Sequence, residues 1–146
     1  MNDKYYTPSI EEFHVGFEYE LKDEYISESQ RLIDWYSQIV NSVQELESVE
    51  FEMQRNSVRV KYLDSEDIES LGFVFTGKSI DKWFKLDGSF DIGGWTSYKI
   101  VLHFNELDHR VFIYADDRGS EEVLFNGIIK NKSELVRLLK QLNITK

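Results

Sequence analysis

Residues 98–104, with the sequence YKIVLHF, decide the fold class of this chain. Large apolar side chains alternate there with more polar ones, with Tyr98, Ile100, Leu102 and Phe104 on one side of the alternation and Lys99 and His103 on the other. Successive side chains of a strand point to opposite faces of a sheet, so a period of two is typical of a half-buried β-strand. The stretch therefore predicts a strand in the second half of the chain.

Outward from this stretch, apolar segments are separated by turn-forming residues. Asp87-Gly88 is a strong hairpin signal, Gly93-Gly94 is another break, and residues 117–120 (DRGS) form a third. Residues 111–115 and 123–129 are predicted strands after short loops. Because consecutive strands joined by short loops usually pair, an antiparallel meander is the simplest topology.

Two further elements follow residue 62. Asp64 or Ser65 is expected to cap a short helix through Leu71, with Gly72 as its left-handed stop. At the end of the chain, Asn131 and Glu134 are placed as a capping pair for a helix over residues 132–142. Its apolar stripe is regular and consists of Leu135, Leu138, Leu139 and Leu142.

The first half predicts a strand, a long helix and a hairpin. Alternation over residues 13–19 indicates the strand, and residues 27–30 (SESQ) fit a capping box for a helix over residues 28–46. The helical stripe consists of Leu32, Tyr36, Ile39, Val43 and Leu46. Residues 49–53 (VEFEM) and 58–62 (VRVKY) both alternate around a short polar connection, which predicts the hairpin.

The expected fold is therefore α+β: a mostly antiparallel sheet, largely a meander, packed against one long helix in the N-terminal half and a C-terminal helix. Residues 1–146 are expected to form a single domain, with residues 1–10 as an irregular entry. The chain is 41% hydrophobic, which favours a core of its own.

Cysteine is absent, which excludes disulfides and thiolate metal sites. No signal-peptide pattern or long apolar run is present, so we expect a cytoplasmic protein that neither crosses nor binds a membrane. We expect no cofactor and no bound metal.

The net charge of −10 lies in the first third of the chain. Residues 1–52 hold thirteen acidic residues against Lys4, Lys22 and Arg31, whereas fourteen acidic and fourteen basic residues follow from residue 53 onward. Such a negative field repels phosphate backbones, so a nucleic-acid partner is disfavoured. A basic or neutral protein partner fits better, and a homodimer stays open as an alternative.

Three stretches carry a resemblance to a known group of proteins: residues 6–20 (YTPSIEEFHVGFEYE), 58–72 (VRVKYLDSEDIESLG) and 127–135 (GIIKNKSEL). Together they resemble short hypothetical proteins of gut Bacteroidetes and their bacteriophages, over roughly a quarter of the chain. That group carries no established activity, cofactor or catalytic residue. The resemblance implies the cytoplasm of a bacterial host cell and an accessory role in a phage or mobile element.

Residues 72–79 (GFVFTGKS) match a phosphate-loop pattern letter by letter, from Gly72 to Lys78 and Ser79. A phosphate loop has to follow a buried strand and open a helix, so that backbone N–H groups surround the phosphates. Here the preceding segment is predicted helical and residues 80–86 have no helical stripe. We therefore interpret the match as accidental.

His14, Glu18 and Glu20 are expected on one strand face beside Gly16, where they could bind a ligand or a metal or act as an acid–base pair. A solvated outer face explains the same residues without a site, and that interpretation is preferred.

The leading hypothesis is a non-catalytic, acidic protein-interaction module. The alternative is a small-ligand or nucleotide-binding protein, in which the loop over residues 88–94 and Trp83 or Trp95 provide a stacking surface. A metal- or carboxylate-dependent enzyme is the third hypothesis, and no catalytic residue is proposed.

Overall fold

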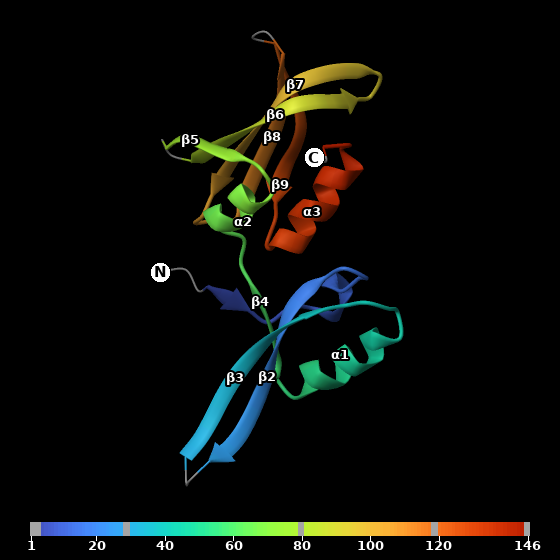
Figure 1. Cartoon of the computed structure of the whole chain (residues 1–146), viewed down its shortest axis with the longest axis vertical. Coiled ribbons are helices and arrows are strands. Elements are labelled where there is room, and N and C mark those ends of the chain that lie inside the picture. The colour runs from blue at the N-terminus through green and yellow to red at the C-terminus, as the bar shows by residue number, and fades with distance from the viewer. Residues whose placement is uncertain (1–3, 28–29, 79–80, 118–119, 145–146) are drawn as a thin grey trace. The chain divides into compact units, whose positions relative to one another are not determined.

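The computed structural model describes residues 4–27, 30–78, 81–117 and 120–144. The chain divides into two compact units, residues 1–62 and 63–146, which are described one at a time (Figure 1). Each unit combines an antiparallel sheet with one or two short helices, which confirms the α+β class.

The first unit has a four-stranded antiparallel sheet in the order β1-β4-β2-β3. Its elements are β1 (Tyr5–Tyr6), the 3-10 helix η1 (Ile10–Glu12), β2 (Glu18–Ser27), β3 (Gln30–Ile39), α1 (Glu45–Gln54) and β4 (Val58–Lys61). The buried side chains of its core are Phe13, Phe17, Val40, Val49, Val58 and Val60.

The predicted helix over residues 28–46 is wrong, because most of that segment is the strand β3. The strand pairs with β2 along its whole length, from Glu18 opposite Ile39 to Ser27 opposite Gln30. Side chains with high strand propensity, such as Ile33, Trp35 and Ile39, occupy alternate positions of it. The apolar spacing of four and three residues is compatible with a helix, but the same segment is also compatible with a strand. Its pairing with β2 decides for the strand.

The first half of the predicted hairpin is also wrong, because residues 49–53 belong to the helix α1. Val49 and Met53, one turn apart, pack against the core of the unit, whereas Phe51 between them is 57% exposed. Glutamate, leucine, methionine and glutamine are good helix formers, so the alternation of Glu50 and Glu52 with apolar residues was misleading. The second half of that prediction is confirmed by β4.

The predicted strand over residues 13–19 begins only at Glu18. Phe13 and Phe17 are buried, but the segment before Glu18 is a turn in which Gly16 has a φ of 95°. The entry predicted to be irregular, residues 1–10, contains β1, and it leads into η1, whose N-terminus is capped by Ser9.

The second unit contains the predicted meander, a five-stranded antiparallel sheet in the order β5-β6-β7-β8-β9. Its strands are β5 (Val74–Lys78), β6 (Lys82–Ile92), β7 (Trp95–Asn105), β8 (Arg110–Asp117) and β9 (Ser120–Ile128). The stretch 98–104 lies in β7, the middle strand, and its apolar residues Ile100, Leu102 and Phe104 are fully buried, whereas Tyr98, which was expected on the same side, is 63% exposed. The sequence pattern thus placed the centre of this sheet correctly.

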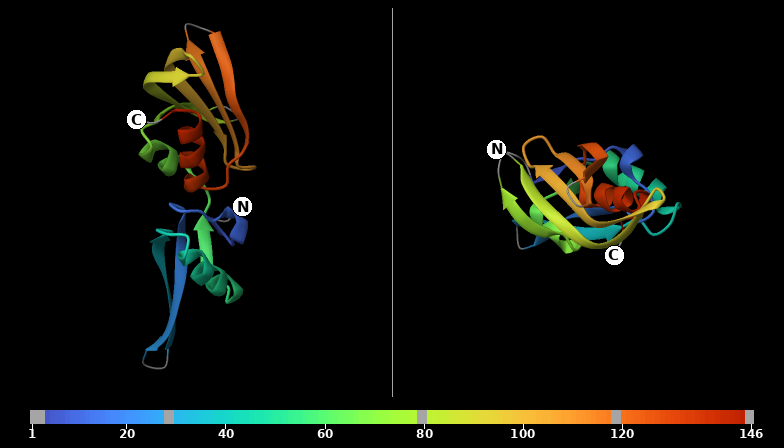
Figure 2. Two further views of the ribbon diagram at one scale, coloured as in Figure 1. Left: turned by 90° about the vertical axis from the view of Figure 1, so that its right-hand side faces the viewer. Right: turned by 90° about the horizontal axis from the view of Figure 1, so that it is seen from above.

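Helices α2 (Ser65–Ser70) and α3 (Lys132–Gln141) cover one face of this sheet (Figure 2). Ile68, Leu135 and Leu139 join Phe84, Ile113 and other core residues in one cluster. As predicted, Asp64 caps α2, Gly72 follows it with a φ of 101°, and Asn131 caps α3.

One turn prediction needs correction. Asp87-Gly88 is not a hairpin turn but part of β6, where the register with β7 shifts between Asp87 and Phe90. The hairpin turn lies at Gly93-Gly94, whose φ angles of 59° and 94° belong to the left-handed region that glycine tolerates. Of the turn predicted at residues 117–120, Asp117 pairs with Ser120, and Arg118 and Gly119 lie outside the described residues.

Within the described ranges, none of the helices has the length and apolar character needed to cross a membrane.

Candidate functional site

The structure does not bring His14 together with Glu18 and Glu20. The two glutamates share one face of β2, as predicted, but His14 lies in the preceding turn with its ring against Phe17. The His14 Nδ1 atom is 3.0 Å from the carbonyl oxygen of Val15. Among the residues that the structure describes, no group of three or more His, Asp or Glu side chains is arranged to hold a metal ion.

Glu20 instead belongs to a cluster that takes one residue from each strand of the first sheet. Its Oε1 atom accepts hydrogen bonds from Nε and Nη2 of Arg59, at 3.0 and 2.8 Å. The guanidinium carbon of Arg59 lies 3.6 Å from the centre of the Tyr5 ring and 4.1 Å from that of Trp35. Tyr5, Arg59, Glu20 and Trp35 come from β1, β4, β2 and β3 in that order, and we call them the cross-sheet cluster.

The cross-sheet cluster lies on the face of the sheet opposite the core. Arg59 and Glu20 are register partners, whereas the core residues Val58 and Val60 flank Arg59 on the other face. A cation over an aromatic ring contributes about 0.5–1 kcal/mol at an exposed site, more when water is excluded. The two stacked contacts therefore tie both outer strands, β1 and β3, to the middle of the sheet.

Strand β3 is an outer strand of this sheet, and half of its backbone groups point away from β2. The N–H of Val40, just past the strand, donates to the carbonyl of Phe17 at 3.0 Å, which places Val40 among the residues bonded toward the β2 side. In an antiparallel pair, successive residues of a strand direct their backbone N–H and C=O groups alternately toward and away from the partner strand. By this alternation, the backbone groups that face the outer side belong to Ile33, Trp35, Ser37 and Ile39.

The side chains of β3 are unusually apolar for an outer strand. Ile33, Tyr36 and Ile39 are 51%, 47% and 44% exposed, and Trp35 is half-buried in the cross-sheet cluster. The strand contains no proline, and its charged residues are Arg31 and Asp34 alone. A long outer strand with these properties is a template for pairing with another chain.

Trp83 lies in the second unit, in a row of side chains that crosses the five-stranded sheet. The register pairs Gly77 with Trp83, Trp83 with His103, His103 with Phe112, and Phe112 with Asn126. These residues alternate with the buried core positions, so they lie on the face away from α2 and α3. We call this surface the open face.

Aromatic rings gather at the centre of the open face. The His103 ring is 6.2 Å from Trp83, 6.1 Å from Phe112 and 5.6 Å from Tyr114, measured between ring centres. Val101, whose register partners are Lys85 and Tyr114, shares this face and is only 1% exposed. Burial, followed by the charges of Glu121 and Asp116, raises the pKa of the Tyr114 phenol above its usual value.

Trp83 and Trp95 do not form one stacking surface. Trp95 follows the Gly93-Gly94 turn and packs against the core cluster of the second unit. Trp83 lies on the opposite face of the sheet, where a Cβ atom on Gly77 would come within 2.8 Å of its indole nitrogen. The ligand surface predicted from the two tryptophans and the loop over residues 88–94 is therefore divided between two faces.

The described part of the phosphate-loop match forms a strand. After Gly72, β5 runs from Val74 to Lys78, and the next described element is the strand β6. Ser79 lies outside the described residues. The described segment therefore lacks the loop followed by a helix that phosphate binding in this motif requires.

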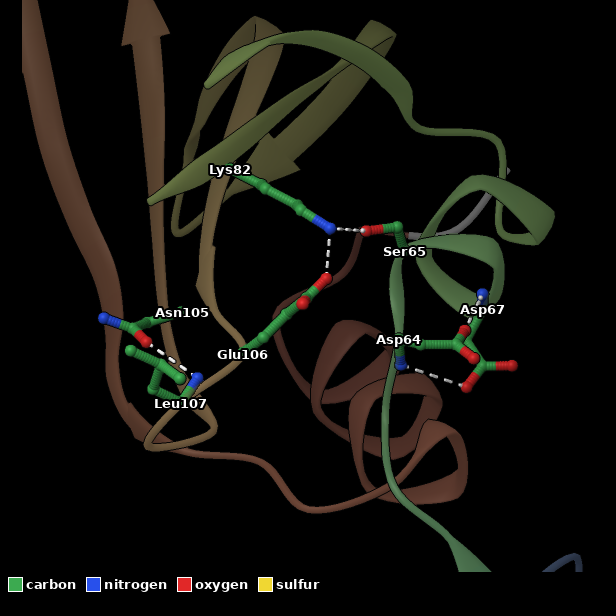
Figure 3. A network of polar contacts seen from close by, with 7 residues as sticks. All are labelled: Asp64, Ser65, Asp67, Lys82, Asn105, Glu106 and Leu107. Carbon is green, nitrogen blue, oxygen red and sulfur yellow. Dashed lines mark hydrogen bonds and ion pairs between the residues drawn. The ribbon is translucent and has the colours of Figure 1, made fainter. Parts of the chain in front are cut away.

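A polar network joins the start of α2 to the sheet (Figure 3). The Lys82 ammonium donates to Ser65 Oγ at 3.3 Å and forms an ion pair with Glu106. Beside it, Asp64 and Asp67 form the capping box of α2. These contacts link the first residue of α2 to the first residue of β6 and to the residue that follows β7.

Sequence reasoning singled out only Glu20 and Trp83 among the residues that build the two surfaces. Trp35 lies in the segment predicted as a helix, and His103 has no sequence neighbours that suggest a ligand set. Tyr5, Arg59, Phe112 and Tyr114 were not considered as site residues. The alternation over residues 98–104 did indicate the open face, because it requires His103 to lie on the face opposite Ile100 and Leu102. The cross-sheet cluster left no such signal, since its members are far apart in the chain.

No family model matches the chain, and neither a curated protein nor a solved structure matches it.

Proposed function

We propose that this protein is a non-catalytic interaction module that captures an extended, basic segment of another protein as an additional strand beside β3. In this mode of recognition, backbone hydrogen bonds supply affinity and alternate side chains supply specificity. The observation that carries the proposal is the ten-residue outer strand β3 with its exposed apolar side chains.

The backbone groups of β3 provide the first part of the recognition. Ile33, Trp35, Ser37 and Ile39 direct their N–H and C=O groups outward at alternate positions, which is the spacing that an added antiparallel or parallel strand requires. The pairing with β2 and the stacking of Trp35 on Arg59 hold this strand in its extended form before a partner arrives. A preformed template lowers the ordering cost of binding.

The side chains provide the second part. Ile33, Trp35, Ser37 and Ile39 follow one another on the face that carries the cross-sheet cluster, by the alternation of the strand. Tryptophan, tyrosine and arginine are the residue types that most often dominate binding energy in protein interfaces. The added strand would thus place its own apolar side chains beside Ile33, Trp35 and Ile39.

Charge selects a basic partner. Residues 1–62 hold thirteen acidic and six basic residues, a net charge of −7. Glu18, Asp23 and Asp34 are exposed on β2 and β3. An opposite charge on the partner speeds encounter, and a like charge disfavours wrong partners.

The test uses a fluorescein-labelled synthetic peptide, KTKVTVKTK, as a basic strand probe, with ETEVTVETE as its matched acidic control. We expect the basic probe to change its fluorescence anisotropy on titration with the protein and the acidic probe not to. Ser37→Pro removes one outward N–H without touching the bonds to β2, and proline is tolerated in outer strands. We expect this variant to bind the probe about tenfold more weakly, whereas Ser37→Ala keeps its affinity.

Equal binding of both probes, or undiminished binding by a folded Ser37→Pro variant, would contradict the proposal. Far-UV circular dichroism checks the fold. If Ser37→Pro does not fold, Ser37→Lys serves instead, because a lysine on an outer strand opposes pairing and repels the basic probe.

A further inference from the structure

The open face of the five-stranded sheet is laid out as four rows of side chains. Besides the row from Gly77 to Asn126, the register places Lys85, Val101 and Tyr114 in one row. Asp87, Lys99, Asp116 and Glu121 form the row at one end, and Asn105, Arg110 and Ile128 form the row at the other end. Apart from Lys85 and Asn126, aromatic and apolar groups therefore occupy the two central rows, and the other charged groups lie in the two end rows, which resembles the anatomy of a protein interface.

We propose that this open face is the interface of a homodimer, in which a second copy of the chain packs face to face with its strands antiparallel to those of the first. This surface and this partner differ from those of the proposed strand capture by β3. The inference rests on the order of the charges and aromatic rings on the open face.

The charges on the open face and at its margin are of both signs. Three ion pairs lie there. The Nζ atom of Lys85 is 3.5 Å from Oδ2 of Asp87, and the Nζ atom of Lys99 is 3.6 Å from Oδ2 of Asp116. The Nε atom of Arg110 is 3.9 Å from Oδ2 of Asp108. A nucleic acid would require a surplus of cations, and a strongly basic protein a surplus of anions. A mixed margin fits a partner surface that is itself mixed, and a second copy provides one.

The two ends of the face complement each other. The end row with Asp87, Lys99, Asp116 and Glu121 carries three carboxylates and one ammonium, whereas the opposite row carries the guanidinium of Arg110. A two-fold axis in the plane of the interface and across the strands brings one end row over the other. Arg110 at the start of β8 then lies opposite Asp116 of the second copy.

The same axis matches the central rows. It passes through the level of Ile113 in β8, so Phe112 of one copy lies over Tyr114 of the other. In β6, Trp83 lies over Lys85 of the second copy, an arrangement that favours a cation over an indole ring. A two-fold interface has to be complementary to itself, and each of these pairs occurs twice in it.

The size of the face sets the expected affinity. With strands about 4.8 Å apart and rows about 6.8 Å apart, five strands and four rows outline roughly 20 × 20 Å, or about 400 Å² per copy. Even with the relief of the side chains, this lies at the lower end of specific interfaces. We therefore expect a weak, reversible dimer.

The experiment is charge complementation by sedimentation velocity of the full chain over a hundredfold range of concentration. We expect the wild type to shift from monomer to dimer as its concentration rises. Arg110→Glu places two carboxylates opposite each other, and Asp116→Arg places two guanidinium groups opposite each other, so each variant alone should dimerise about tenfold more weakly. An equal mixture of the two should form a heterodimer, because both of its cross-interface pairs have opposite charges.

Restored association in the mixture would support the proposal in a way that a folding defect could not, and circular dichroism confirms that each variant is folded. A wild type that stays monomeric at every concentration would overturn it. So would a mixture of folded variants that stays monomeric, or a dimer that Arg110→Glu leaves intact. A dimer that Ser37→Pro abolishes would place self-association at β3 and overturn the open-face interface, while leaving the peptide-probe result to decide the proposed function separately.

Discussion

At the scale of single residues, Arg59 shows how one side chain organises a surface. Its guanidinium group is planar, so both faces stack on rings, those of Tyr5 and Trp35, while its edge donates to Glu20. Lysine offers neither the planar face nor the fixed donors. The cluster therefore depends on arginine at this position, and the stack explains why Trp35 is half-buried while its neighbours on the outer strand are exposed.

Tyr114 provides a prediction of pH dependence. Burial, together with Glu121 and Asp116, raises the pKa of its phenol in the folded protein above the value of about 10 expected in the unfolded chain. The fold thus favours the neutral phenol, and this contribution to stability is fully present below pH 10. It is lost as the pH rises through the raised pKa, because the unfolded chain ionises first.

We therefore expect the free energy of unfolding, measured with urea at a series of pH values, to fall as the pH rises above about 10. Tyr114→Phe removes one ionising group and should flatten part of this decline. Tyr19 and Tyr36, whose pKa values are also raised, account for part of the remainder. Identical pH profiles for the wild type and Tyr114→Phe would show that the Tyr114 environment has no such effect.

At the scale of elements, caps and pairing partners decide where helices and strands begin and end. Asn131 accepts a hydrogen bond from the N–H of Glu134 at 2.8 Å, and the residue is only 2% exposed. Replacing a buried cap leaves the first-turn N–H group of α3 without that acceptor. The first turn of α3, which positions Leu135 and Leu139 in the core, is then less stable.

We expect Asn131→Ala to lower the free energy of unfolding by about 1–2 kcal/mol, measured by urea denaturation. Asn131→Ser is the matched variant, since its hydroxyl still accepts the bond, and it should lose clearly less. Equal losses for both variants would mean that the cap contributes little and that packing of the asparagine accounts for the effect.

At the scale of the whole molecule, the distribution of charge is the dominant feature. Thirteen acidic and six basic residues fall in residues 1–62, whereas residues 63–146 have fourteen acidic and eleven basic residues. The two proposed surfaces differ accordingly. The strand-capture surface lies in the strongly acidic unit, and the open face has charges of both signs at its margin.

Salt should therefore act strongly on strand capture. Screening shortens the reach of exposed charges to about 8 Å at physiological ionic strength. We expect the affinity for the peptide KTKVTVKTK to fall about tenfold when NaCl rises from about 0.05 to 0.5 M. Fluorescence anisotropy measures this change, and a salt-independent affinity would mean that charge does not select the partner.

The sequence by itself determined the elements whose pattern admits one interpretation: the strands at residues 98–104, 111–115 and 123–129, the short helix that ends before Gly72, and the capped C-terminal helix with its stripe of leucines. In each, the period or the cap is local, so neighbouring residues suffice to specify the structure. The same period placed His103 on the face away from the core, although the aromatic cluster around it was not foreseen.

Only the tertiary structure decided residues 30–54. Residues 30–39 satisfy a helical stripe and an alternating strand alike, and residues 49–53 alternate although they form a helix. Intrinsic propensities differ by less than about 1 kcal/mol per residue, so they do not choose between such readings. The pairing of β3 with β2 and the stacking of Trp35 on Arg59 do choose, and the stack joins residues 24 positions apart in the chain. Those interactions exist only once the distant segments have met, which is why this strand and the surface it presents were beyond reach of the sequence pattern.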